Sequence, residues 1–176
     1  MKKLNLGSGP DVRDGWENYD RDEYEGVTVG DIKDGLPWGD GTFDIVVANH
    51  FLQMMKYVDL PTTLTEIRRV LTHKGVVRIL VPDLLSAVSA YRHGHLDWFP
   101  IVNEAETTTG GKLCAYVSWY SEANLVFTPA WLAELLQRNG FEPAVVTCGF
   151  SAFGPPEIVE LDSRPTESLV VEGRKR

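Results

Sequence analysis

Short runs of β-forming residues recur along this chain, and helical patterns lie between the later ones. This alternation is typical of a mostly parallel sheet covered by helices, so the sequence predicts an α/β fold. The last two runs have no helical pattern between them, which predicts that they pair antiparallel. The runs expected to form strands are residues 3–6, 16–20, 27–29, 44–48, 76–82, 141–150 and 168–172.

Apolar residues at helical spacing predict a helix over residues 60–71, with Pro61 in its first turn and Gly75 just past its end. A second helix is expected over about residues 129–139, where the side chain of Thr128 can cap the first turn.

Asp83 can cap a further helix that stops near Gly94 and buries Leu84, Leu85, Val88 and Tyr91. Residues 92–127 show no regular pattern. A segment this long is usually a lid or a binding loop, so we expect it to contact substrate. Its aromatic residues can form either a substrate wall or part of the core: Trp98, Phe99, Tyr116, Trp119 and Tyr120.

The length of 176 residues predicts a single domain spanning residues 1–176. Seventeen Lys and Arg residues against twenty-five Asp and Glu residues give a formal net charge of −8, which disfavours nucleic acid as a partner. A small-molecule substrate is expected instead, bound by a monomer or homodimer.

No apolar run is long enough to be a leader or a membrane span, so we expect no membrane association and a cytoplasmic location. Cys114 and Cys148 are too far apart for a paired zinc motif, and both are expected to be reduced, with Cys148 in the core. His93 and His95 have poor metal-ligand spacing, so no metal site is expected.

The first predicted strand runs into Gly7-Ser8-Gly9, a turn in which a ligand can approach the backbone closely. A dinucleotide-binding loop would need a third small residue where Val12 stands. Only ten residues separate Gly9 from Asp20, too few for the usual crossover helix. Without that helix dipole, the loop favours a nucleoside cofactor that lacks phosphates.

Carboxylates follow the next two predicted strands. Asp20 has two acceptor oxygens that can take both hydroxyls of a ribose. Asp31 and Ile32 can offer a polar contact to an adenine edge and an apolar wall to its face.

These residues occur in an order that resembles a class I S-adenosylmethionine-dependent methyltransferase of the type-11 group. The matching segments are residues 4–9 (LNLGSG), 18–20 (NYD), 30–32 (GDI), 36–38 (LPW), 40–50 (DGTFDIVVANH), 66–79, 81–84, 127–129, 139–141 and 168–173. The resemblance implies a Rossmann-like, doubly wound seven-stranded sheet of order 3-2-1-4-5-7-6 with the last strand antiparallel. The chain departs from the family in its abbreviated first helix and in the missing third glycine of the first loop.

The resemblance also implies S-adenosyl-L-methionine as cofactor and a site for it at the ends of the first strands. Gly7 and Gly9 would lie against its methionine part, Asp20 would bind the ribose, and Asp31 with Ile32 would hold the adenine. The residues expected at the cofactor are Leu6, Gly7, Ser8, Gly9, Asp20, Arg21, Asp31, Ile32 and Asn49.

Methyl transfer chiefly requires alignment of the acceptor with the methyl group. If the acceptor is a hydroxyl, His50 is the best-placed general base, although a packed or hydrogen-bonded histidine is the more common role for such a residue. The sequence therefore predicts a methyltransferase acting on a small molecule, at a hydroxyl or carboxylate oxygen in preference to nitrogen. The alternatives are a catalytically silent S-adenosylmethionine-binding or interaction domain and a nicotinamide-dependent reductase.

Overall fold

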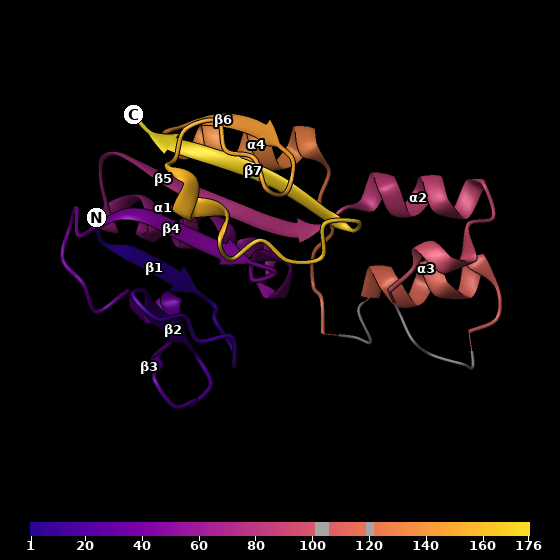
Figure 1. Cartoon of the computed structure of the whole chain (residues 1–176), viewed down its shortest axis with the longest axis horizontal. Helices are drawn as coiled ribbons and strands as arrows, with labels where there is room; N and C mark the ends of the chain where they lie inside the picture. The colour runs from indigo at the N-terminus through magenta and orange to yellow at the C-terminus, as the bar shows by residue number, and fades with distance from the viewer. Residues whose placement is uncertain (101–105, 119–121) are drawn as a thin grey trace.

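The computed structural model describes residues 1–100, 106–118 and 122–176. Its centre is a seven-stranded sheet of order β3-β2-β1-β4-β5-β7-β6 (Figure 1). Neighbouring strands are parallel from β3 to β5, and β7 runs antiparallel to both β5 and β6. The predicted fold class and strand order are confirmed. The strands are β1 Lys3–Leu6, β2 Glu17–Asp20, β3 Thr28–Val29, β4 Phe43–Asn49, β5 Leu71–Pro82, β6 Phe141–Val146 and β7 Ser168–Lys175.

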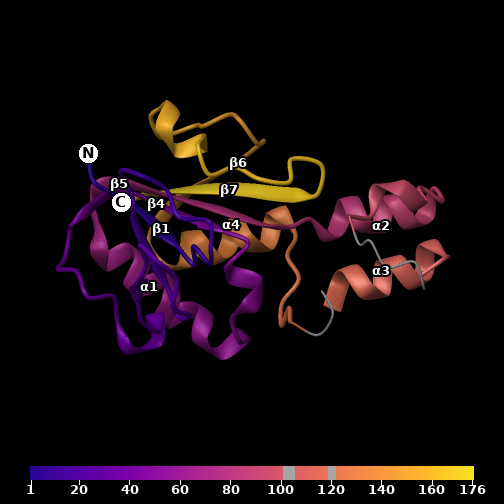
Figure 2. The same cartoon turned by 60° about the horizontal axis from the view of Figure 1, so that its bottom comes forward.

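Helices α1 (Leu60–Val70) and α4 (Pro129–Arg138) cover one face of this sheet (Figure 2). Their apolar stripes are buried against the strands in the main core. As expected, the Thr128 side chain caps α4 by accepting a hydrogen bond from the backbone of Trp131. This half of the core follows directly from the helical spacing of the leucines.

The opposite face of the sheet is covered by the segment between β6 and β7 (Figure 2). Ile158 and Leu161 of this segment, together with Trp16, bury Ile45 and Val47 of the sheet and other apolar side chains. Residues 7–16, all of them described, form turns and no helix, in agreement with the expected loss of the first crossover helix. A loop from the C-terminal part therefore packs on the sheet face next to β1.

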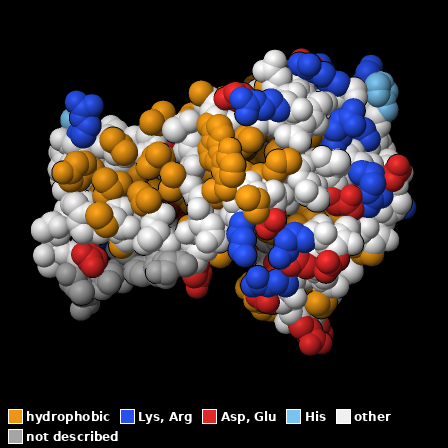
Figure 3. Space-filling model, turned by 180° about the vertical axis from the view of Figure 1, so that it is seen from behind, with side chains coloured by type: hydrophobic (Ala, Val, Ile, Leu, Met, Phe, Trp, Pro, Cys, Tyr) orange, Lys and Arg blue, Asp and Glu red, His pale blue; other side chains and the backbone are white. Residues whose placement is uncertain are grey.

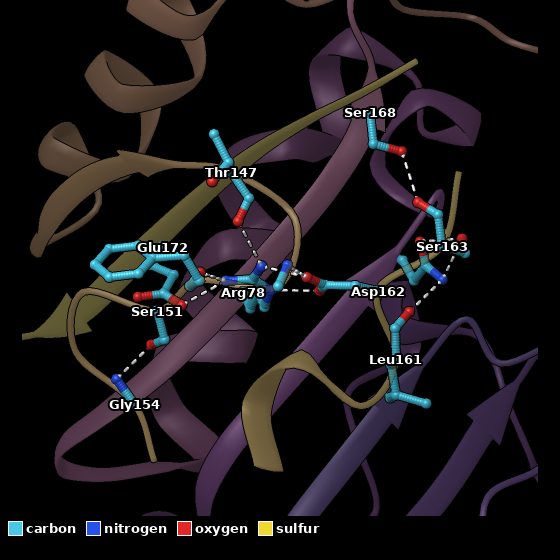
Figure 4. A network of polar contacts seen from close by, with 12 residues as sticks. Arg78, Thr147, Ser151, Gly154, Leu161, Asp162, Ser163, Ser168 and Glu172 are labelled. Atoms are coloured by element: carbon cyan, nitrogen blue, oxygen red, sulfur yellow. Dashed lines mark hydrogen bonds and ion pairs between the residues drawn. The ribbon is translucent and has the colours of Figure 1, made fainter. Parts of the chain in front are cut away.

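Arg78 of β5 anchors this covering segment. Its side chain is fully buried, and its Nε and Nη2 atoms each donate to an Asp162 carboxylate oxygen at 2.6 Å (Figure 4). Nη1 donates to Glu172 at 2.6 Å and to the Phe150 carbonyl at 3.0 Å, and Nη2 also donates to the Thr147 carbonyl. These contacts explain why β6 ends at Val146 and does not reach residue 150 as expected, because Arg78 binds the carbonyls that would continue the strand.

Two further expectations differ from the structure in this part. Strand β5 begins at Leu71, five residues before the expected start, because Leu71 pairs with Phe43 ahead of a register shift. Gly75 therefore lies within a strand and not just past a helix. Cys148, at the start of the covering segment, is half-buried rather than fully buried, although it packs against the core of this sheet face. Both cysteines are free.

Helices α2 (Leu84–Arg92) and α3 (Thr109–Ser118) form an arm that extends beyond the strand ends (Figure 1). Hydrophobic side chains gather on this arm and on the adjoining middle of the molecule (Figure 3). The expectation that residues 92–127 are irregular is wrong for residues 109–118. Gly110 and Gly111 lie in the first turn of α3. Glycine is a poor helix former, so the sequence did not predict this helix.

The packing of α2 also differs from the expectation. Asp83 caps the helix as predicted, by accepting from the Leu85 backbone. However, Ala87 and Ala90 are its buried residues, whereas Leu85 and Tyr91 are exposed. Short alanine side chains allow α2 and α3 to approach closely, and Phe99 and Tyr116 fill the remaining space; these four residues form a small separate core.

Candidate functional site

A cleft of about 720 Å³ lies at the carboxyl ends of the first strands. Parallel strands end at the same edge of a sheet, which is where open α/β folds bind ligands. The volume is within the range of small-molecule and cofactor sites. Of the residues predicted to act in the site, those that line this cleft are Gly7, Ser8, Gly9, Asp20, Arg21, Asp31, Ile32 and His50.

The glycine turn after β1 is bound to β2. Gly7 and Ser8 donate their backbone N–H groups to the Tyr19 carbonyl at 2.8 and 3.1 Å, and Gly9 donates to Oδ2 of Asp20 at 2.7 Å. In a dinucleotide-binding loop, such amides point at a pyrophosphate. Here all three amides are used within the chain, so the turn fits a cofactor without phosphates.

Asp20 is held in a fixed orientation at the end of β2. Its Oδ2 accepts from Gly9, and its Oδ1 accepts from the backbone of Asp22 at 3.0 Å. A carboxylate has about four lone-pair positions, so each oxygen can still accept one further hydrogen bond. The two hydroxyls of a ribose supply two such donors, and the residues present therefore fit a nucleoside.

Asp31 caps the short helix η1 (Ile32–Asp34) just after β3. Oδ1 accepts from the Lys33 backbone at 3.0 Å, and Oδ2 lies 3.1 Å from Nζ of Lys33. Although partial burial opposes it, these Lys33 contacts hold the pKa of Asp31 below its usual range. The carboxylate is therefore charged at neutral pH and can accept a hydrogen bond from an amino group.

Ile32 contributes less open surface than the sequence suggested. It lines the cleft, but its side chain is 4% exposed and belongs to the main core. Its role as a wall for adenine stays a prediction.

His50 follows β4 in a left-handed conformation, with φ at 51°. Its backbone N–H donates to the Leu80 carbonyl at 2.9 Å, and its own carbonyl accepts from Nε2 of Gln53 at 2.6 Å. Non-glycine residues held in this region of φ gather at functional sites. Arg164, with φ at 53°, is a second one, and it lines the same cleft.

The imidazole of His50 is neutral at physiological pH. Burial, with a smaller contribution from the positive charge of Arg164, lowers the pKa of His50 from 6.5 to about 4. The ring contacts Oγ of Ser168 through Nε2 at 2.9 Å. A neutral imidazole can accept a hydrogen bond, but a pKa this far below neutral makes it a weaker base than an ordinary histidine. The role of His50 as general base stays a prediction.

Leu6 and Asn49, both expected at the cofactor, are not among the described residues that line the cleft. Leu6 is fully buried in the core. Asn49 donates from Nδ2 to the Leu161 carbonyl at 2.8 Å and to Ser163 Oγ at 3.0 Å, two residues visible in Figure 4. Asn49 thus ties the end of β4 to the segment before β7.

Sequence reasoning missed several residues of the cleft. Gln53, Met54 and Lys56 follow His50, and Glu122, Asn124 and Arg164 come from distant segments. Because His50 follows the end of β4, the residues just after it in the sequence could also have been expected at the cleft. No sequence signal marks Arg164, which packing brings there from more than a hundred residues away.

Of the aromatic candidates, Trp98, Phe99 and Tyr116 pack on one another in the arm, and Trp119 and Tyr120 lie outside the described residues.

No helix in the described ranges is both long and apolar enough to cross a membrane. A comparison with curated proteins gives no match.

Many solved structures share the fold of this chain. A SAM-dependent methyltransferase from Archaeoglobus fulgidus aligns with a TM-score of 0.62 at 14% identity, covering 99% of this chain and 86% of that one. A possible histamine N-methyltransferase from Thermotoga maritima aligns with a TM-score of 0.59 at 17% identity, covering 99% and 82%. The 1,6-didemethyltoxoflavin-N1-methyltransferase of Burkholderia thailandensis, solved with S-adenosylhomocysteine, aligns with a TM-score of 0.60 at 18% identity, covering 98% and 70%.

A family model described as a methyltransferase domain matches residues 9–79, which include Asp20, Asp31 and His50. The architecture agrees with that match from β1 to β7. Residues 9–79 thus match a methyltransferase domain, and the whole chain shares the fold of S-adenosylmethionine-dependent methyltransferases. Together the match and the fold imply S-adenosylmethionine as the cofactor.

Proposed function

We propose that this domain transfers a methyl group to an oxygen atom of a small molecule, a hydroxyl or carboxylate in preference to a nitrogen. The observation that carries the proposal is the contact between Gly9 and Asp20. This hydrogen bond fixes the Asp20 carboxylate at the cleft. The backbone N–H groups of the loop, which a phosphate would need as donors, are already bonded within the chain.

We assign the cofactor-binding roles as follows. Asp20 accepts hydrogen bonds from the ribose hydroxyls, and Asp31 accepts one from the amino group of adenine. The turn from Gly7 to Gly9 lies beside the methionine part. When bound, S-adenosylmethionine supplies a methyl group on a positively charged sulfur, so little acid catalysis is required of the protein.

The acceptor is placed at the end of the cleft formed by His50, Gln53, Met54 and Arg164. His50 orients a hydroxyl acceptor and takes the proton that it releases, which then passes to solvent. The pKa of about 4 keeps the His50 imidazole neutral, so it can accept from the hydroxyl at neutral pH. The same low pKa makes it a weak base, which passes the proton on to solvent.

A small molecule is favoured over nucleic acid because the chain carries a net charge of −8. Two relatives with the same fold are named for small-molecule substrates, and both names specify transfer to nitrogen. At 17% and 18% identity these names support a small-molecule substrate, but they do not determine which atom is methylated. Oxygen is placed first because His50 can accept the proton of a hydroxyl. We also propose that the protein acts in the cytoplasm as a monomer or homodimer.

Calorimetric titration with S-adenosylhomocysteine tests the proposal. We expect micromolar binding to the wild type and loss of at least about tenfold in affinity in Asp20→Ala, since hydrogen bonds to a charged group contribute about 1.5–3 kcal/mol. Asp22→Ala is the matched control, because Asp22 also lines the cleft and its replacement removes the same charge. This variant should bind nearly as the wild type does. Wild-type protein that gives no heat would favour the silent interaction domain, and heat with NAD(H) instead would favour the reductase.

A further inference from the structure

The hydrogen bonds of Ser168 determine which nitrogen of His50 carries the proton. Ser168 Oγ lies 3.0 Å from the Ser163 carbonyl, which can only accept (Figure 4). The single hydroxyl proton of Ser168 is therefore directed at Ser163. The contact of 2.9 Å between Ser168 Oγ and Nε2 of His50 must then be donated by the imidazole.

The neutral imidazole thus has its proton on Nε2 and a lone pair on Nδ1. Nδ1 is buried and has no hydrogen-bond partner among the described residues. A buried acceptor without a hydrogen bond destabilises the folded state, and such atoms call for an explanation.

Gln53 provides a second acceptor of the same kind. Its side chain is 4% exposed, and its Oε1 also has no partner within the described part of the chain. The amide cannot be reversed without cost, because Nε2 donates to the His50 carbonyl at 2.6 Å, and reversal would bring two oxygens together there. Two unsatisfied acceptors therefore belong to neighbouring residues that both line the cleft.

We propose that the methyl acceptor carries a hydrogen-bond donor and is recognised by Nδ1 of His50 and Oε1 of Gln53, with Ser168 as the positioning residue that keeps Nδ1 unprotonated. This inference rests on the proposed function and narrows it by excluding carboxylate acceptors, which leaves the hydroxyl as the acceptor oxygen. At neutral pH a carboxylate has no proton to donate, and its negative oxygens would face two further acceptors. Both protein atoms are shielded from bulk water, so this recognition requires a small shift of the side chains that line the cleft.

An amine shares the donor chemistry of a hydroxyl, so an assay must separate the two. Methyl transfer from S-adenosylmethionine should be measured over three panels of small molecules that carry a hydroxyl, an amino group or a carboxylate on the same carbon frameworks. Transfer to the hydroxyl panel supports the inference. Transfer to carboxylates alone overturns it, and transfer to amines alone supports the recognition by donors but overturns the assignment to oxygen. Protein that binds S-adenosylhomocysteine and methylates none of the panels would contradict the proposed function, which is a separate result.

Nitrogen NMR of histidine-labelled protein tests the positioning role of Ser168 without any substrate. The spectrum should show His50, assigned by its loss in His50→Gln, as the neutral tautomer with the proton on Nε2. In Ser168→Ala, the tautomers should mix and kcat/KM should fall about tenfold or more. Ser151→Ala is the matched control, because Ser151 accepts a hydrogen bond from Gly154 in the covering segment, and it should change neither. A proton on Nδ1 in the wild type, or an unchanged tautomer in Ser168→Ala, would overturn the inference.

Discussion

Gly7 lies directly against the ring of Phe51, so that a Cβ added at Gly7 would lie 2.7 Å from the Cγ atom of Phe51. This contact joins the turn after β1 to the segment after β4, and both residues line the cleft. Gly9, two residues later, has the same left-handed backbone but open space around it.

Gly7→Ala should therefore destabilise the protein more than Gly9→Ala. Both variants place a side chain in the left-handed region, at a cost of about 1–2 kcal/mol. Only Gly7→Ala also forces Phe51 to move, which adds about 1–3 kcal/mol. Urea unfolding measures the difference, and equal loss in the two variants would contradict the close packing.

The stability of the protein should depend on pH through His50. Its pKa is about 4 in the folded protein and 6.5 in an unfolded chain, so the unfolded state binds a proton first as the pH falls. The neutral imidazole contributes about 3 kcal/mol to the free energy of unfolding, and this contribution is complete above pH 6.5. It is lost as the pH falls from about 6.5 to 4.

His50→Gln should flatten this part of the stability profile, measured by urea unfolding at several pH values. His93→Gln, at an exposed position on the arm, is the control and should keep the wild-type slope. A slope that survives in His50→Gln would mean that other groups produce it.

Glu167 should destabilise the protein at neutral pH. Its side chain is 3% exposed, and both carboxyl oxygens lack a hydrogen-bond partner in the described part of the chain. Nε of Arg164 lies 3.6 Å from Oε1 of Glu167. Burial raises the pKa of Glu167, and the charge of Arg164 only partly opposes this. The folded state therefore holds this proton more tightly than the unfolded state does, and stability is lost as the pH rises through the folded pKa.

Glu167→Gln keeps the size of the side chain and removes the buried charge. We expect a gain of about 1 kcal/mol at pH 7, measured by thermal or urea unfolding. The gain should shrink towards pH 4.5. A loss of stability at pH 7 would show instead that the ion pair with Arg164 dominates.

Arg78→Met should be severely destabilising, by about 3–5 kcal/mol, because it leaves Glu172 and Asp162 without their buried partner. Arg174→Met, which removes a half-exposed ion pair with Glu142, is the matched control and should cost about 1 kcal/mol or less. Urea unfolding of the two variants checks both values. Similar losses would contradict the central role of the buried network.

The sequence predicted most of the fold because its strands and helices carry strong local signals. β1, α1 and α4 lie within a residue of their expected bounds. The misses arise from long-range contacts: Arg78 ends β6 early, and the packing of α2 on α3 overrides the apolar stripe of α2. Periodicity describes one element at a time, so it carries no information about such partners.

The candidate site divides in the same way. Gly7, Asp20 and Asp31 were predictable because they stand where strands end, and all three line the cleft. The partners of His50 were not predictable. Ser168 lies 118 residues away in β7, and only the antiparallel pairing of β7 with β5 brings it to the imidazole.

The segment that covers the second sheet face has a practical consequence for protein engineering. Glu160 accepts from Nε1 of Trp16 at 3.2 Å and lies 3.6 Å from Nζ of Lys3, so it fastens the beginning of the chain to its last third. Cutting the protein after residue 79, where the family match ends, would leave Ile45 and Val47 in contact with water. A shortened version of this protein must therefore retain β7 and everything that leads to it. Grafting only residues 1–79 onto another scaffold would require other side chains to cover Ile45 and Val47.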